Sequence, residues 1–148
     1  MKVGIISDTH GYLDPCVHDV FCGVGVIVHA GDIGSPGILM ELETIAPVYA
    51  VLGNCDYFEY GAQVVTRATP RLGGRRFLIV HMQREIGSID DDVRVVVTGH
   101  THRSDIRHEN GRLFVNPGSA SEPRDGTPSV AIVNLKDDGT EDARIVRL

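Results

Sequence analysis

Short apolar runs that each stop at a polar residue recur along this 148-residue chain, and they constrain its fold more than any other feature. The runs over residues 3–6, 24–30 and 48–52 are continuous and rich in valine and isoleucine, as buried strands are. Between them, residues 14–22 and the stretch from Ser35 to Pro47 have apolar residues at helical spacing, and both open on a capping residue followed by proline. This alternation predicts parallel strands joined by helical crossovers.

The second half of the chain predicts strands and loops without long helices. Residues 63–68 and 75–80 are expected to form a strand pair around a turn at Gly73 and Gly74. Residues 82–92 are polar and predict a loop with at most one turn of helix. Further strands are expected over residues 93–97, 113–115, 129–135 and 142–147. The predicted fold class is α/β, with one domain over residues 1–148.

Composition and charge narrow the possible partners and the compartment. Hydrophobic residues make up 42% of the chain and charged residues 23%, which is ordinary for a globular domain. The longest apolar stretch is about eight residues, far below the roughly 20 that span a bilayer. The first run ends too early for a signal peptide, and three cysteines without CxxC spacing suggest no disulfide framework. We therefore expect a cytoplasmic protein with no membrane contact. Its net charge of −6 argues against a nucleic-acid groove.

Polar residues that end the apolar runs predict a metal site. The five run-ending residues are Asp8, Asp32, Asn54, His81 and His100. Ligands of open α/β sheets collect beyond the carboxyl ends of strands, so one pocket can receive all five side chains. His10 and His102 lie two residues after a run-ending residue and project to the same side in an extended chain.

These seven side chains offer two carboxylates, one amide oxygen and four imidazoles. Such a mixed set suits Mn, Fe, Ni or Zn and is large enough for two ions if one carboxylate bridges them. Any one of these residues alone would be a turn former or a structural histidine more often than a ligand. Their concentration, with four of the seven histidines at strand ends, favours the metal site.

The order and spacing of these motifs resemble the calcineurin-like metallophosphoesterases. The matching motifs are Asp8-x-His10, Gly31-Asp32, Gly53-Asn54-x-Asp56, His81 and Gly99-His100-x-His102. Cys55, the stretch from Asn116 to Ser119 and the pair Pro123-Arg124 resemble the compact single-domain phosphodiesterase branch of bacteria and archaea. The resemblance implies a sandwich of two mixed β-sheets flanked by helices, with the metal site at the carboxyl ends of the strands.

The resemblance also implies roles for individual residues. Asp8, His10 and His102 would bind one divalent ion, Asn54, His81 and His100 would bind a second, and Asp32 would bridge them. Manganese is the expected metal, with nickel, iron, cobalt or zinc as alternatives. A hydroxide held between the ions would attack a small phosphodiester. Expected catalytic residues are Asp32, Asn54, Cys55 and Asp56, with Arg124 and Gly11 as substrate contacts; a turn carboxylate at Asp56 and a surface arginine at Arg124 are equally plausible.

The chain departs from the family pattern at two positions. Cys55 stands where many relatives have a histidine, and a neutral thiol is a poor general acid near pH 7. We therefore hypothesise a preference for substrates with good leaving groups or internal strain, such as aryl or cyclic phosphodiesters. Relatives commonly read His-Gly-His after the sheet strand, whereas this chain has His81, Met82 and Gln83, and its segment up to His100 is shorter. Gln83 cannot carry a proton.

Two other function classes compete with the enzyme. A eukaryotic relative in the retromer sorting coat uses this fold chiefly for protein contacts, so a metal-binding interaction scaffold is the main alternative. A scaffold is free to lose metal ligands, and this chain keeps all seven. A nuclease would need a basic groove that this acidic chain lacks. A homo-oligomer is left open, because Tyr57, Phe58 and Tyr60 could line either a substrate entrance or a dimer contact.

Overall fold

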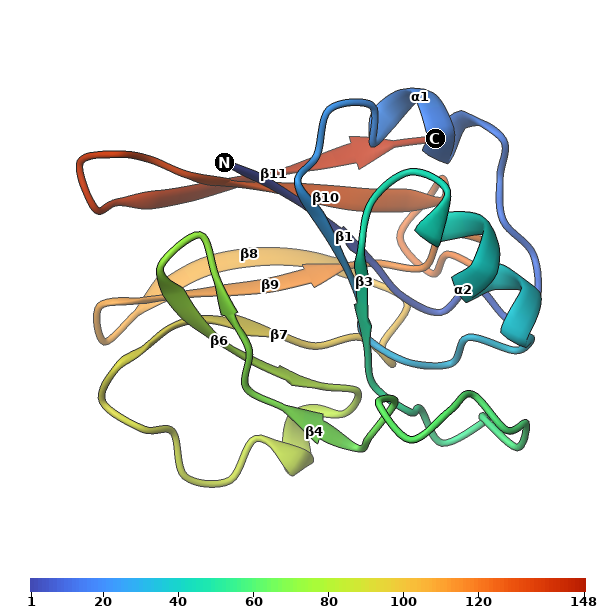
Figure 1. The fold of residues 1–148 in the computed structure, drawn as a ribbon, viewed down its shortest axis with the longest axis horizontal. Coiled ribbons are helices and arrows are strands. Elements are labelled where there is room, and N and C mark those ends of the chain that lie inside the picture. Colours follow the sequence, from blue (N-terminus) through green and yellow to red (C-terminus); the bar gives the residue numbers. More distant parts are fainter.

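Two β-sheets stacked face to face form the body of the protein (Figure 1). The computed structural model describes residues 1–148. The first sheet has the strand order β11-β10-β1-β2-β3. In it, β1 pairs in parallel with β2 and antiparallel with β10, so the sheet is mixed. Its strands are β1 Lys2–Ile6, β2 Val26–His29, β3 Val48–Ala50, β10 Ser129–Leu135 and β11 Glu141–Arg147.

The second sheet is also mixed and has six strands. Its parallel centre is β6-β7-β9, and the antiparallel strands β4, β5 and β8 lie at its margins. Its strands are β4 Arg67–Ala68, β5 Arg71–Leu72, β6 Arg75–Val80, β7 Val93–Val97, β8 Ser104–Glu109 and β9 Arg112–Pro117.

Both α-helices cover the first sheet on the face turned away from the second (Figure 1). Helix α1 spans Cys16–Val20 and helix α2 spans Pro36–Glu43. The Ser35 hydroxyl accepts a hydrogen bond from the backbone N–H of Gly37 at 3.2 Å, which satisfies one donor at the start of α2. The absence of a side chain at Gly4 in β1 allows the Phe21 ring to pack against the sheet. None of the helices is long and apolar enough to cross a membrane.

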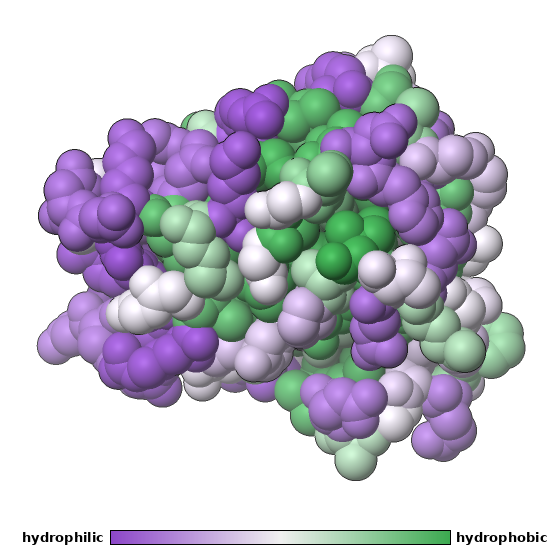
Figure 2. All heavy atoms as spheres, turned by 45° about the horizontal axis from the view of Figure 1, so that its top comes forward, coloured by the Kyte–Doolittle hydropathy of each residue, from purple (hydrophilic) through white to green (hydrophobic).

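The main core lies between the two sheets. Residues of β1 alternate, so that Val3 and Ile5 face the second sheet whereas Ile6 faces the helices. The second sheet contributes Phe77 and Val95, among others, to the same buried cluster. Because both faces of the first sheet are covered at its centre, the central strands β1, β2 and β10 are mainly apolar and buried. Apolar atoms remain visible on the face shown in Figure 2, within a largely hydrophilic border.

The outer face of the second sheet is only partly covered. Its small apolar cluster consists of Leu78, Val80, Val93 and Val96. Ile86 and Ile89, from the segment between β6 and β7, pack against this cluster. That segment contains only the single 3-10 turn η1, Gln83–Glu85, as the polar sequence of residues 82–92 predicts. Part of this face, around Phe114, therefore remains accessible.

The predicted fold class is confirmed, and several predicted element bounds are wrong. The helix expected over residues 14–22 is limited to Cys16–Val20. Residues 63–66 form no strand beyond one isolated bridge between Val51 and Val65, and the turn at Gly73 and Gly74 joins β5 to β6. Strand β8 was not predicted, because its sequence is polar and lies at the sheet margin, where burial imposes no apolar alternation.

Candidate metal centre

The predicted ligands follow the carboxyl ends of strands from both sheets. Asp8 and His10 follow β1, Asp32 follows β2 and Asn54 follows β3, all in the first sheet. His81 follows β6, and His100 and His102 follow β7, in the second. Stacking of the sheets brings these two sets of loops together, so the centre lies where the sheets meet at one end.

Left-handed backbone conformation marks the ligand positions. Six non-glycine residues have a positive φ angle, and five of them are predicted ligands. These are Asp8 (φ 54°), His10 (47°), Asp32 (53°), His100 (70°) and His102 (55°). Such a conformation is unfavourable for side chains with a Cβ atom and persists only where the surroundings enforce it. These residues lie in the loops just after the strands, where their side chains converge on the centre.

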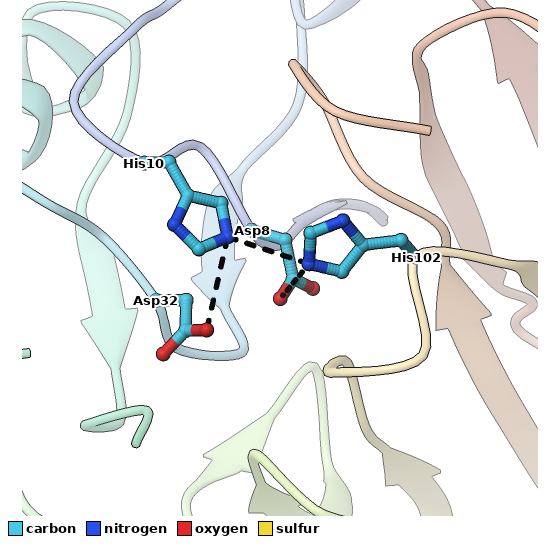
Figure 3. Close-up of side chains that lie close together, drawn as sticks. All are labelled: Asp8, His10, Asp32 and His102. Atoms are coloured by element: carbon cyan, nitrogen blue, oxygen red, sulfur yellow. Dashed lines mark hydrogen bonds and ion pairs between the residues drawn. The ribbon is translucent and has the colours of Figure 1, made fainter. Parts of the chain in front are cut away.

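The side chains form two groups that share Asp32. Asp8, His10, Asp32 and His102 offer ligand atoms that all lie within 4.8 Å of one another, and Asp32, His81 and His100 do the same. Figure 3 shows the first group converging from three separate loops. The amide oxygen of Asn54 lies 3.1 Å from Nε2 of His81, which places it beside the second group. All seven predicted ligands are thus brought together.

Hydrogen bonds on the far side of two rings fix which nitrogen faces the centre. Nδ1 of His102 donates to the backbone oxygen of Glu122 at 2.6 Å, so a neutral His102 presents the lone pair of Nε2 inwards. This Nε2 lies 3.2 Å from Oδ1 of Asp8. Oδ1 is buried and has no hydrogen-bond partner. Two acceptors therefore face each other.

In the second group, too, an imidazole nitrogen faces acceptor oxygens. Nδ1 of His81 donates to the backbone oxygen of Ala30 at 2.7 Å, which leaves Nε2 turned inwards. This nitrogen lies 3.1 Å from Oδ1 of Asn54 and 3.4 Å from Oδ2 of Asp32. Acceptors at such distances repel one another unless a positive charge lies among them. The donor set therefore fits divalent cations in both groups.

The ionisation of both carboxylates depends on their surroundings. Burial raises the pKa of Asp8, although the Ser7 hydroxyl and the nearby histidines oppose this. Burial also acts on Asp32, but in the metal-free protein a protonated His81 and the hydrogen bond from the backbone N–H of Cys55 lower its pKa to about 2. A hydrogen bond from Ser7 and the backbone N–H of His100 hold Oδ2 of Asp8, which leaves Oδ1 directed at the centre.

Glycines precede three of the ligands and lie against ligand residues from other loops. A Cβ atom at Gly31 would lie 2.7 Å from Nδ1 of His81, and one at Gly53 would collide with the Asp32 carboxylate. A Cβ atom at Gly99 would collide with Ser7 and lie 2.8 Å from Oδ2 of Asp8. The glycines before Asp32, Asn54 and His100 therefore allow the loops to approach closely enough to form one centre.

His29 connects two of the loops that carry ligands through hydrogen bonds of its ring nitrogens. The Thr9 hydroxyl donates to the backbone oxygen of Ile33 at 2.8 Å, so it accepts from Nε2 of His29 at 3.0 Å. Nδ1 of His29 in turn accepts from the backbone N–H of Gly31 at 3.2 Å. Burial lowers the pKa of His29 to about 4, so the ring is neutral at pH 7. His29 therefore links the loop of Asp8 and His10 to the loop of Asp32.

Asp56 anchors the loops rather than lining the pocket. Its Oδ1 accepts from the backbone N–H of Ile33 at 2.9 Å, from that of Gly34 at 3.0 Å and from the Tyr60 hydroxyl at 2.9 Å. Its Oδ2 accepts from the backbone N–H of Gly53 at 2.8 Å. One carboxylate therefore ties the Asp32 loop to the Asn54 loop, so Asp56 positions ligands, whereas the sequence analysis predicted either a catalytic residue or a turn carboxylate.

Two further positioning residues come from the stretch Asn116 to Ser119. The Ser119 hydroxyl donates to the backbone oxygen of Asp8 at 2.7 Å. The Asn116 amide donates to the backbone oxygen of Gly99 at 2.9 Å and to the Thr101 hydroxyl at 3.1 Å. Both side chains hold ligand loops in place. The sequence offered one signal for them, since this stretch follows an apolar run as the ligands do.

A pocket of about 220 Å³ opens over the centre. Its lining comprises His10, Asp32, Asn54, Cys55, His100, His102, Glu122 and Arg124. Gly11 does not line this pocket, and its backbone N–H donates to the backbone oxygen of Ile33. Burial and the negative charge of Asp32 raise the pKa of the Cys55 thiol, so it is neutral at pH 7. Its Sγ lies 3.4 Å from Nδ2 of Asn54.

Comparisons with known proteins agree with this geometry. The family model of the calcineurin-like phosphoesterase superfamily domain matches residues 1–138. A protein of Methanothermobacter thermautotrophicus described as a probable metallophosphoesterase is 36% identical, over 99% of this chain and 92% of that protein. The structure of an archaeal phosphodiesterase superposes with a TM-score of 0.79 at 24% identity, covering 99% of this chain and 100% of that one. Vps29 of Entamoeba histolytica superposes with a TM-score of 0.77 at 21% identity, covering 100% and 99%.

Proposed function

The chain belongs to the calcineurin-like phosphoesterase superfamily, and from this premise we propose that it is a phosphodiesterase that hydrolyses small phosphodiesters with two divalent metal ions. Asp8, His10 and His102 would hold one ion, Asn54, His81 and His100 the other, and Asp32 both. Manganese is the first choice from the family resemblance, with nickel, iron, cobalt or zinc as alternatives, since a set of oxygen and nitrogen ligands without thiolate suits all of them.

The observation that supports this proposal is that hydrogen-bond acceptor atoms of different ligand residues face one another in the centre. Oδ1 of Asp8 has no hydrogen-bond partner, and the inward nitrogens of His81 and His102 face carboxylate or amide oxygens. When bound, the two ions would lower the pKa of a water molecule and neutralise charge that develops on phosphate oxygens. Asp8 and Asp32 bring two negative charges against four positive ones, so the loaded pocket attracts a phosphate despite the acidic chain.

Residues of the pocket wall would orient the ester. Arg124 lines the pocket and supplies the only guanidinium in its wall, a group suited to gripping a phosphate oxygen. Its backbone N–H donates to the backbone oxygen of His102 at 2.8 Å, which fixes the Arg124 backbone relative to the ligand loop. His10, His100 and His102 would be occupied as metal ligands, and the neighbouring Cys55 thiol is a poor proton donor to a leaving group because its pKa is raised.

This absence of a dedicated acid supports diesters with good leaving groups as substrates. The related archaeal phosphodiesterase and a phosphodiesterase of Methanocaldococcus jannaschii that is 27% identical support the diester class. Aryl or cyclic phosphodiesters need little protonation of the departing oxygen, so Cys55 would not limit their hydrolysis. We also propose a cytoplasmic location, because three cysteines without CxxC spacing suggest no disulfide framework.

The rival proposal is a protein-interaction scaffold. It is favoured by the fold similarity to Vps29, which covers the full chain. The complete set of ligands favours the enzyme, since contacts between proteins do not require paired acceptors buried at the end of a sheet. Metal content and catalysis separate the two proposals.

The decisive experiment measures metal content and phosphodiester hydrolysis on the same samples. Wild type loaded with Mn, Ni, Co, Zn or Mg is analysed for metal and assayed with bis-p-nitrophenyl phosphate, beside Asp32→Ala and the exposed control Asp138→Ala. We expect hydrolysis with at least one metal, loss of more than about a hundredfold in Asp32→Ala, and normal rates in the control. Full occupancy by every metal without hydrolysis would overturn the proposal in favour of the scaffold.

A further inference from the structure

A second pocket, of about 170 Å³, lies across the loop from the metal centre. Gly99, Thr101 and Arg103 line this pocket, whereas His100 and His102 line the pocket over the centre. Successive residues of one short loop thus alternate between the two pockets. Thr101 is exposed. A molecule bound at the metal centre therefore has to cross only this loop to place a substituent in the second pocket.

The short connection between β6 and β7 leaves this pocket open. The pocket lies on the outer face of the second sheet, where Phe114 of β9 and Ile86 after η1 provide its apolar wall. Gln83 of η1 lines it too, and does not line the pocket over the centre. The residue that departs from the family pattern after His81 therefore faces a site beside the metals.

Three polar groups in the lining have no partner within the chain. The Gln83 amide, the Thr98 hydroxyl and the Arg103 guanidinium take part in no hydrogen bond or ion pair of the structure. Arg107 in the same lining is engaged, because it bonds Asp105 at 2.7 Å and Glu109 at 3.2 Å. The unengaged guanidinium of Arg103 offers only N–H donors, and the Gln83 amide offers N–H donors beside its own carbonyl oxygen. They would suit a ligand with carbonyl oxygens.

The remaining surface of the pocket is partly apolar. The Arg107 guanidinium carbon lies 4.6 Å from the centre of the Phe114 ring, so two planar groups are stacked in the wall. Planar heterocycles stack on aromatic rings and on arginine planes. The volume is below the roughly 300 Å³ of pockets for drug-sized ligands, which favours a single ring system.

We propose that this pocket is a substrate subsite for a carbonyl-bearing nucleobase, carried as a nucleoside on one ester of the phosphodiester. The role of this pocket as a substrate subsite rests on the proposed phosphodiesterase function. Binding of a nucleoside in the pocket does not. Arg103 and Gln83 would donate to the carbonyl oxygens of the base, and its faces would lie against the Ile86 and Phe114 side of the pocket. Bases with a carbonyl group at this edge are then preferred over adenine, which presents an amino group.

The first test measures binding on the metal-free protein, so that it does not depend on catalysis. Uridine, inosine, adenosine and ribose are titrated in the presence of EDTA, and backbone amide shifts of Thr98 and Thr101 are followed by NMR. We expect uridine and inosine to bind at least about tenfold more tightly than adenosine or ribose. Arg103→Ala should remove this advantage. Equal binding of all four probes would overturn the subsite.

Arg84→Ala is the matched control. Arg84 is exposed, follows Gln83 directly and does not line the pocket, so its removal changes the same charge nearby without changing the lining. It should bind the nucleosides as wild type does. If Arg84→Ala weakens binding as much as Arg103→Ala, general electrostatic attraction explains the result and the subsite is refuted.

The second test uses the metal-loaded enzyme. Uridine 5′-(p-nitrophenyl phosphate) is compared with methyl p-nitrophenyl phosphate, which has the same leaving group but no base. Arg103→Ala should raise KM for the uridine ester about tenfold, with kcat unchanged and no effect on the methyl ester. An equal effect on both esters would count against the subsite. Failure of wild type to hydrolyse either ester would refute the phosphodiesterase, while the nucleoside titrations still decide the pocket.

Discussion

Nε2 of His10 lies 3.3 Å from Nε2 of His102, across 92 residues of sequence. His10 follows a strand of the first sheet and His102 follows a strand of the second, so this contact closes the sandwich at one end. With Nδ1 of His102 engaged by the backbone of Glu122, a neutral His102 directs the lone pair of Nε2 at His10, where either the Nε2–H of His10 or a cation can meet it. A cation bound here would therefore link the two sheets.

Metal binding should stabilise the fold through this link. At a hundredfold excess over the dissociation constant, Mn²⁺ should raise the melting temperature of wild type by about 5 to 10 °C relative to EDTA. Asp8→Asn removes a ligand and should lose most of the increase, whereas the exposed control Asp138→Asn should keep it. Differential scanning calorimetry measures both. An undiminished increase in Asp8→Asn would contradict a metal at this position.

Asp56 should act on metal affinity through the loops it joins. Asp56→Asn places an amide N–H₂ group against backbone donors, so the Asp32 and Asn54 loops should shift and Mn²⁺ affinity should fall about 10- to 100-fold. Tyr60→Phe removes only one of the four hydrogen bonds and should have a smaller effect. Isothermal titration of both variants measures the difference. Equal losses would show that the carboxylate has no special role among these bonds.

Cys55 should set the dependence on the leaving group. In a series of methyl aryl phosphodiesters, wild-type kcat should fall steeply as the pKa of the departing phenol rises, because the thiol does not protonate it. Cys55→His should flatten this dependence and raise kcat most for the poorest leaving group. Cys22→Ser, an exposed cysteine outside the pocket, is the control. A wild-type kcat independent of the leaving group would refute the hypothesis.

His29 should make the stability of the metal-free protein depend on pH. Burial lowers its folded-state pKa to about 4, whereas the unfolded value is 6.5. Below pH 6.5 the unfolded chain gains a proton that the folded protein does not accept, so stability falls by up to about 3 kcal/mol as the pH decreases to 4. His29→Asn has no such titration. Its deficit relative to wild type should therefore be largest at pH 7 and narrow towards pH 4.

Urea denaturation in EDTA at pH 7, 6, 5 and 4 provides this comparison. His108→Asn, which changes an exposed histidine of β8, is the control and should follow wild type throughout. A gap between wild type and His29→Asn that is constant from pH 7 to 4 would show that His29 does not remain neutral in the fold.

The ligands could be predicted from the sequence because each is the polar residue at which an apolar run stops or lies two residues after such a residue. That pattern is local, and parallel pairing converts it into proximity. The role of Asp56 could not be predicted in this way, since its partners Ile33 and Gly34 lie in another loop that only the folded chain brings near. Strand β8 was not predicted for a related reason. Its own residues are mostly polar, and it forms only by pairing with β9 at the margin of the sheet.

The left-handed backbone at the ligand positions determines which substitutions would stabilise the metal-free fold. His100 is exposed and has a φ angle of 70°, a conformation that glycine adopts without penalty. His100→Gly should therefore make the metal-free fold more stable by about 1 kcal/mol while it removes a ligand. A laboratory screen for heat resistance alone would select such changes first. The metal ligands with a left-handed backbone are thus kept at a cost to the stability of the metal-free fold.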